Sequence, residues 1–380
     1  MTSAHWPQRL TALDVSRGVA ALSVVLWHWQ HFAYSGVSPA SDFERSDQPL
    51  YAPLRLFYEH GDMGVDYFFI LSGFIFHWLY GASVENRSVT AGRFVMQRFS
   101  RLYPLHFLTL LLVAGLQYAY SALTDVSFVY AHNDIGHFVL HLFFASNWWP
   151  SLGYSFNGPI WSVSIEVLLY AVFFVMAVRA KSGWPWALAL SLLAFVAVQF
   201  LPVFLFRGMA LYFMGGVVFH LATHVTDRAR DLAPWVFGLA CLSWSAVLVG
   251  VYLFDLSAWL TSLGVPMYRL VPVFTTYVLF PATVCAIALL DVSRGGFLKS
   301  IAWVGDITYS SYLIHFPLQL LFAFAVSFGL LGSGFWREPL YLVLFFALLI
   351  PGAWLTYRYF EMPAQRWLRK RLSFGARSPV

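Results

Sequence analysis

The stretch LTALDVSRGVAALSVVLWHWQHF, residues 10–32, predicts a helix long enough to cross a membrane. It carries Arg17 and His28, eleven residues apart. At about 100° per residue this spacing is three turns plus roughly 20°, so both side chains share one stripe, roughly 16 Å apart along the axis. Asp14 falls near the same stripe. Ionisable groups in a membrane usually face a bundle interior or a water-filled cavity, so we expect this stripe to face a functional site.

The composition is that of a membrane protein. Of the 380 residues, 59% are hydrophobic and 11% are charged, whereas soluble domains carry about 25% charged residues. Cys241 and Cys285 both lie in apolar stretches, which indicates neither a disulfide framework nor a metal cluster. No cleavable signal peptide is expected, because the first apolar helix carries charges near its start and no small-residue cleavage site follows it.

Hydropathy predicts an all-α integral membrane bundle of about ten transmembrane helices. The expected spans are 10–33, 64–81, 98–121, 160–180, 184–204, 206–223, 233–253, 270–290, 301–329 and 336–358. With both termini cytoplasmic, 18 of the 23 Lys and Arg residues lie inside. The short apolar stretch 136–149 is expected to be re-entrant or interfacial, since a further crossing would place the basic C-terminus outside.

The same pattern predicts the domain organisation. Residues 1–365 form one transmembrane domain, and 366–380 form a short basic cytoplasmic tail that contacts lipid headgroups. The acidic segment 33–63 is the first external loop. It either helps to cover an outward-facing site or is an ordinary solvated loop.

The fourth span begins on the outer side with a polar face. Ser162, Glu166 and Tyr170 follow i, i+4, i+8 spacing, and Trp161 precedes them. Glu166 is expected about one turn below the outer surface, at a depth like that of His28. A carboxylate beside an imidazole forms a general base and its orienting partner. The alternative is a structural, hydrogen-bonded pair.

Arg98 and Arg101 open the third span on the cytoplasmic side, followed by Tyr103 and Pro104. A planar guanidinium binds phosphate in a bidentate manner, so this segment is a candidate site for an anionic ligand. The alternative is that both arginines are ordinary cytoplasmic anchors.

Polar residues also mark the second and ninth spans. Asp66 is expected to hydrogen-bond at the entrance of the second span, where Gly73 permits close helix packing. In the ninth span Pro317 predicts a kink. His315 either satisfies backbone groups freed by that kink or contacts substrate. Tyr309 and Tyr312, three residues apart, are expected on one face.

Motifs for other chemistries are lacking in the sequence. His137 and His141 are four residues apart without the glutamate of a zinc protease, so no metal is expected. Neither a glycine-rich phosphate loop nor a Gly-x-Ser-x-Gly nucleophile elbow occurs.

Taken in order, the motifs resemble the acyltransferase-3 family, which are integral membrane acyltransferases of the O-antigen acetylase type. The resemblance covers about residues 8–365. It rests on Arg17 with His28, Phe-Phe-Ile-Leu-Ser-Gly-Phe at 68–74, Arg98–Arg101 with Tyr103-Pro104, Trp161-Ser162 with Glu166, and the segment from Tyr309 to Pro317. The chain is similar to stand-alone members, without an extra C-terminal hydrolase-like domain.

The resemblance implies transfer of an acyl group, usually acetyl, from cytoplasmic acyl-CoA to a hydroxyl of a carbohydrate or glycolipid. Acceptors in the family include O-antigen, exopolysaccharide, nodulation-type lipo-oligosaccharide and macrolide sugars. The implied catalytic residues are His28, as base or acyl relay, and Glu166. The donor-side candidates are Arg17, Arg98, Arg101 and Tyr103. The resemblance places Trp161, Ser162 and Glu166 on the acceptor side. The substrate-binding candidates are Asp66, Trp161, Ser162, Tyr170, Tyr309, Tyr312 and His315.

The expected partners are acyl-CoA as co-substrate, the acceptor and membrane lipids. No permanently bound cofactor, metal or nucleic acid is expected, and the location is the bacterial inner membrane. Direct transfer and a covalent acyl-His28 intermediate both remain open. One alternative is a transporter with a proton relay at Arg17, His28 and Glu166, although the sequence lacks the repeat symmetry of such proteins. Another is a non-enzymatic component of a polysaccharide-assembly complex; release of free CoA thiol separates both from an enzyme.

Overall fold

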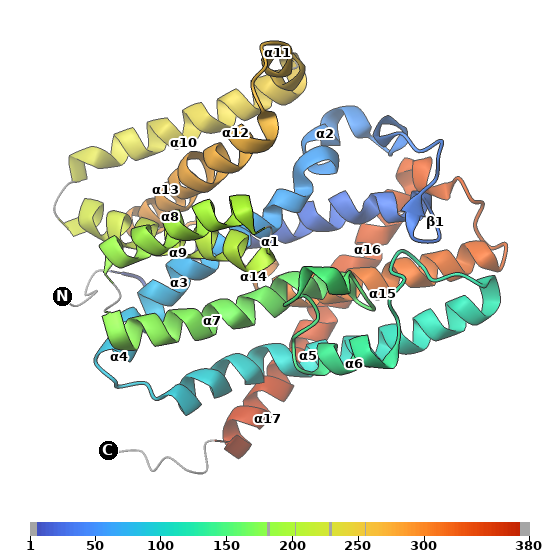
Figure 1. The fold of residues 1–380 in the computed structure, drawn as a ribbon, viewed down its shortest axis with the longest axis horizontal. Coiled ribbons are helices and arrows are strands. Elements are labelled where there is room, and N and C mark those ends of the chain that lie inside the picture. Colours follow the sequence, from blue (N-terminus) through green and yellow to red (C-terminus); the bar gives the residue numbers. More distant parts are fainter. Residues whose placement is uncertain (1–5, 181–182, 202, 228–229, 255, 373–380) are drawn as a thin grey trace. The chain divides into compact units, whose positions relative to one another are not determined.

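The computed structural model describes residues 6–180, 183–201, 203–227, 230–254 and 256–372. The protein is an all-α integral membrane protein. Within the described residues, strands are limited to one hairpin, in which β1 (Tyr34–Ser35) pairs antiparallel with β2 (Ser38–Pro39) (Figure 1).

Within the described part of the chain, eight helical segments are long and apolar enough to cross a membrane. They are Tyr51–Glu85, Ala91–Thr124, Gly158–Arg179, Phe204–Asp227, Ala233–Leu253, Arg269–Arg294, Thr308–Ser327 and Pro339–Arg371. Two further predicted spans are shorter helices, α1 (Thr11–Trp27) and α8 (Trp184–Phe200). Each of the ten predicted spans therefore contains a helix, while the number of crossings and the orientation of the termini stay predictions.

The chain divides into two compact units, each built from three separate segments. The first unit contains Met1–Val24, Pro53–Ser88 and Leu168–Gly305. The second contains Val25–Ala52, Val89–Val167 and Asp306–Val380. Two helices, α1 and α7 (Trp161–Ala180), continue from one unit into the other along the chain.

Close helix packing organises the first unit. Gly73 on α3 (Gly64–Phe76) lies against the backbone carbonyl of Tyr212 on α9 (Phe204–Asp227), where a Cβ atom would overlap that carbonyl. The predicted packing role of Gly73 is thereby confirmed. Asp291 on α13 (Phe280–Arg294) accepts hydrogen bonds from the backbone N–H of Ala12 and Leu13, at 2.9 and 3.1 Å. A carboxylate at this end stabilises the α1 N-terminus.

The other elements of the first unit are mostly helices. They are α4 (Ala82–Glu85), α8, α10 (Ala233–Leu248), α11 (Leu256–Ser262) and α12 (Met267–Phe274), with α14 (Trp303–Asp306) at the end of its last segment. The helix α2 (Tyr51–His60) precedes α3, so the predicted loop 33–63 contains both a hairpin and a helix.

In the second unit, α5 (Ala91–Thr124) and α15 (Thr308–Ser327) lie side by side and run in the same direction (Figure 1). Near their starts the Tyr309 hydroxyl donates to the Leu102 carbonyl at 2.7 Å. Near their ends the rings of Tyr120 and Phe324 are 5.4 Å apart. The helix α16 (Pro339–Thr356) packs against α15 and leads into α17 (Met362–Leu372).

The apolar stretch 136–149 contains a single short helix, α6 (Ile135–Leu142), of 8 residues. Eight residues are too few to cross a bilayer, in agreement with the predicted non-spanning segment. Asp134 caps this helix by accepting from the His137 backbone N–H at 3.1 Å. That bond holds the pKa of the Asp134 carboxyl below its ordinary value.

Candidate active site

His28 stands where the α-helical part of α1 ends and a 3-10 turn, His28–Ala33, begins. The residue is buried, with 7% of its surface exposed. It stacks on His315 at 5.1 Å between centroids and lies 4.7 Å from the ring of His31. We call these three residues, all in the second unit, the histidine cluster. The arrangement buries three imidazoles, and the His28 ring contacts each of the other two.

Gln319 on α15 fixes two members of the histidine cluster. Its side-chain nitrogen donates to the His28 backbone carbonyl at 2.8 Å. Its side-chain oxygen lies 3.1 Å from His31 Nδ1. Because that oxygen only accepts, His31 Nδ1 must carry the proton. Gln319 therefore ties the 3-10 turn to α15 and sets the tautomer of His31.

His315 presents its second nitrogen to the interior. Its Nδ1 lies 2.7 Å from the Tyr312 carbonyl, which only accepts, so Nδ1 carries the proton and Nε2 holds a lone pair. This Nε2 is buried and has no hydrogen-bond partner among the described residues. Pro317 lacks the N–H that would bond the Leu313 carbonyl. The Asn157 amide donates to that carbonyl instead, at 3.0 Å.

The structure brings together two residues that were predicted to bind substrate. The hydroxyls of Ser162 and Tyr312 are 2.9 Å apart, and Tyr312 also donates to the Pro159 carbonyl at 3.0 Å. Glu166 follows one turn after Ser162 on α7 and is half-buried, within Coulombic range of Tyr312. Ring stacking and these hydrogen bonds connect His28 through His315 and Tyr312 to the start of α7.

The predicted donor-side arginines lie near the start of α5, and the structure adds a third basic residue. Arg98 and Arg101 are half-buried. Between them Ser100 accepts a hydrogen bond from Arg369 on α17, at 3.4 Å. Tyr103 stacks on a neighbouring phenylalanine of α5 at 4.4 Å. This basic end of the second unit concentrates guanidinium groups.

Helix geometry gives the distance along the second unit between its basic end and the histidine cluster. From Arg98 to Tyr120, α5 rises roughly 33 Å at 1.5 Å per residue, and a hydrocarbon core is about 30 Å thick. Tyr309 is level with Leu102, and His315 lies about 9 Å further along α15. The histidine cluster thus lies inside the unit, between the basic end and the opposite end of α5.

Three predicted site residues belong to the first unit. Arg17 donates to the Gly305 carbonyl at 2.6 Å. Asp66 forms an ion pair with Arg207 at 2.7 Å, which fits its predicted hydrogen-bonding role at the start of α3. Tyr170 stacks on an aromatic ring of the second span at 4.4 Å. The roles of these residues toward substrate stay predictions.

Sequence reasoning missed His31, Gln319 and Asn157. Gln319 carried a usable signal, since it is a polar residue four positions after His315 in an apolar helix and so shares its face. Asn157 lies in an irregular segment before α7, where periodicity carries no information.

Comparison with known proteins identifies the class. The family model described as an acyltransferase domain matches residues 10–358. With its apolar helices, the protein is therefore a membrane acyltransferase. It belongs to the acyltransferase-3 family.

Three curated relatives agree with this assignment. Protein 2 in the picA locus of Rhizobium radiobacter is 32% identical over 47% of this chain and 84% of its own length. The exopolysaccharide production protein ExoZ of Rhizobium meliloti (strain 1021) is 28% identical over 71% of this chain and 80% of its own. The acyltransferase MdmB of Streptomyces mycarofaciens is 29% identical over 43% of this chain and 38% of its own length. No solved structure matches the chain.

Proposed function

We propose that the protein transfers an acyl group, most readily acetyl, from cytoplasmic acyl-CoA to a hydroxyl of a carbohydrate or glycolipid at the outer face of the bacterial inner membrane. The observation that carries this proposal is the buried histidine cluster, held by Gln319 between a basic end and the opposite end of the same unit. Membership of an acyltransferase family favours group transfer over the transporter alternative.

The basic end suits the acyl donor. CoA carries phosphates, and Arg98 and Arg101 supply bidentate guanidinium groups. Arg369 adds a third one beside Ser100. The pantetheine arm then extends along the helices of the second unit toward His28. The sugar acceptor arrives from the other end of the unit. Its hydroxyl reaches the histidine cluster beside Ser162, which meets Tyr312 just before His315 on α15, and Trp161 precedes Ser162.

In the direct route, the imidazole of His28 accepts the proton of the acceptor hydroxyl. The hydroxyl oxygen attacks the thioester carbonyl carbon, the C–S bond breaks, and the CoA thiolate takes the proton back from the imidazolium. Glu166 orients and stabilises the protonated imidazole. General-base catalysis of this kind contributes about 10²–10⁴-fold. In the covalent route, a His28 ring nitrogen attacks the thioester carbonyl carbon, the C–S bond breaks and CoA leaves as the thiolate. The acceptor hydroxyl oxygen then attacks the acyl carbon, the bond to His28 breaks, and the hydroxyl proton ends on the CoA thiolate.

The test is acyl transfer by the purified full-length protein in liposomes. We expect radiolabelled acetyl-CoA to yield free CoA thiol and label bound to carbohydrate from a bacterial polysaccharide extract. Succinyl-CoA is the parallel donor that reports acyl selectivity. A folded protein that neither binds nor turns over any acyl-CoA would overturn the proposal. It would favour the transporter alternative instead, because a transporter releases no CoA thiol.

A further inference from the structure

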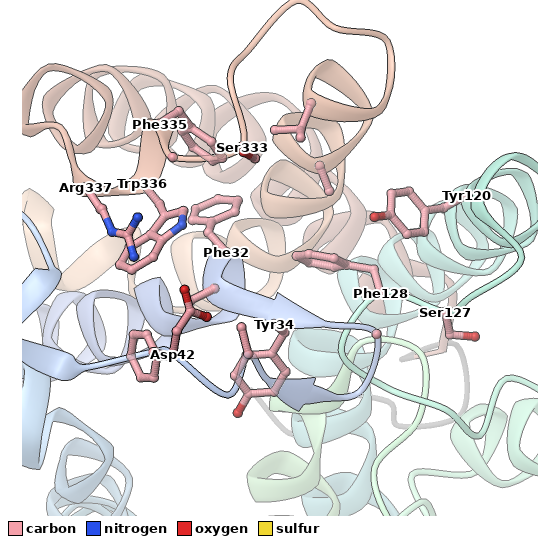
Figure 2. Close-up of a pocket in the computed structure, with 17 residues that line it drawn as sticks. Phe32, Tyr34, Asp42, Tyr120, Ser127, Phe128, Ser333, Phe335, Trp336 and Arg337 are labelled. Atoms are coloured by element: carbon pink, nitrogen blue, oxygen red, sulfur yellow. The ribbon is translucent and has the colours of Figure 1, made fainter.

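The second unit contains a cavity of about 370 Å³ beside the histidine cluster. This volume falls within the range of roughly 300–1,000 Å³ that small-molecule sites occupy. Figure 2 shows aromatic rings and polar groups arranged around the hollow. The principal lining residues are Phe32, Tyr34, Asp42, Phe128, Trp336 and Arg337.

We propose that this cavity is the acceptor subsite and binds a neutral saccharide ring, an inference that rests on the proposed function. Sugars present C–H faces, which pack on aromatic rings, and hydroxyl edges, which hydrogen-bond to carboxylate and hydroxyl groups. The cavity offers both kinds of partner. Phe32, Phe128 and Trp336 supply rings, while Asp42 supplies a carboxylate.

Charge argues for a neutral ligand over a phosphate. The Arg337 guanidinium is already paired with Asp47 at 3.1 Å and lies 4.7 Å from the centre of the Trp336 ring. Asp42 is exposed, and among the described residues its carboxylate makes no hydrogen bond or ion pair. The Asp42 carboxylate is therefore available as a negatively charged hydrogen-bond acceptor. It repels a phosphate group but accepts hydrogen bonds from sugar hydroxyls.

The cavity wall is held in place by buried polar contacts. Gln117 makes two hydrogen bonds to the Phe128 backbone, accepting from its N–H at 3.1 Å and donating to its carbonyl at 2.8 Å. The next residue, Val129, has φ 64°, a costly conformation for a β-branched side chain. Its N–H donates to the Gly36 carbonyl at 3.0 Å, which ties this loop to the hairpin. Such strained, over-determined backbone is common at ligand sites.

The cavity adjoins the proposed chemistry. Tyr34 lines it and also contacts the His31 ring edge-on, with 5.3 Å between centroids. Phe32 lines it one residue after His31 in the same 3-10 turn. A sugar ring seated in the cavity is therefore separated from His31 by the Tyr34 side chain.

The test measures saccharide binding directly, using saturation-transfer NMR on the full chain in nanodiscs. The probes are neutral methyl hexosides, with their 6-phosphates for comparison. We expect saturation transfer to the neutral glycosides and weakening by about tenfold in Asp42→Asn, since this change removes a charged hydrogen-bond acceptor. Glu44→Gln is the matched control, because Glu44 is exposed in the same loop but does not line the cavity.

The outcomes separate this inference from the proposed function. Binding of radiolabelled acetyl-CoA is measured on the same preparations. Three results would overturn the acceptor subsite. The first is intact acetyl-CoA binding without any saccharide signal. The others are an equal loss of saccharide binding in Asp42→Asn and Glu44→Gln, and tighter binding of the phosphorylated sugars than of the neutral ones. Saccharide binding without acetyl-CoA binding would instead contradict the proposed donor.

Discussion

Replacing Gln319 with leucine should disable the histidine cluster without removing any imidazole. The change deletes the acceptor for the His31 Nδ1 proton and the donor to the His28 carbonyl. Gln319 is fully buried, so both groups lose their partners away from water. Each unsatisfied buried group costs about 1–3 kcal/mol, which lowers the free energy of unfolding by about 2–6 kcal/mol. Loss of alignment at the reacting centre should lower kcat by about 10²-fold.

The assay compares kcat and the KM for acetyl-CoA, with thermal unfolding in nanodiscs measured alongside. A positioning role predicts a fall in kcat with little change in that KM, because the donor phosphates bind elsewhere. Gln319→Glu keeps an acceptor for His31 but loses the donor to His28, so its activity should fall between wild type and Gln319→Leu. Gln199→Leu, at an exposed glutamine of α8, is the control. Wild-type kcat in folded Gln319→Leu would refute the positioning role.

Two further changes probe the donor end and the helix packing. Arg98→Ala combined with Arg101→Ala should raise the KM for acetyl-CoA by about tenfold or more, because hydrogen bonds to charged groups are lost; an unchanged KM would assign both arginines to membrane anchoring. Gly73→Val should reduce the yield of folded protein and lower its thermal midpoint, since a Cβ atom overlaps the Tyr212 carbonyl. Size-exclusion profiles in detergent measure that effect, and a profile and midpoint equal to wild type would contradict the close approach.

Hydropathy was sufficient to predict the helical class and the placement of the long helices. Burial in lipid demands continuous apolar segments, and charged residues mark their ends. The short segment 136–149 was also predicted not to span, and α6 has only 8 residues. The hairpin and α2 within 33–63 were missed, since polar turn residues there disguise short elements.

The candidate site was only partly accessible from sequence. Spacing within one helix predicted that Ser162 and Glu166 share a face, and the hydrogen bond from Ser162 to Tyr312 shows that this face meets α15. Contacts between helices distant in sequence depend on packing, which periodicity does not encode. The joining of His28 and His31 by Gln319 is such a contact, at a separation of almost 300 residues.

The proposed function depends above all on His28 carrying acyl transfer. The most direct measurement is CoA-thiol release and labelled carbohydrate formation from radiolabelled acetyl-CoA by His28→Ala, with acetyl-CoA binding measured on the same sample. The exposed histidine variant His60→Ala is the control. We expect that His28→Ala still binds acetyl-CoA but forms no acylated product, whereas His60→Ala retains wild-type turnover. Near-wild-type turnover by folded His28→Ala would contradict both the direct and the covalent route.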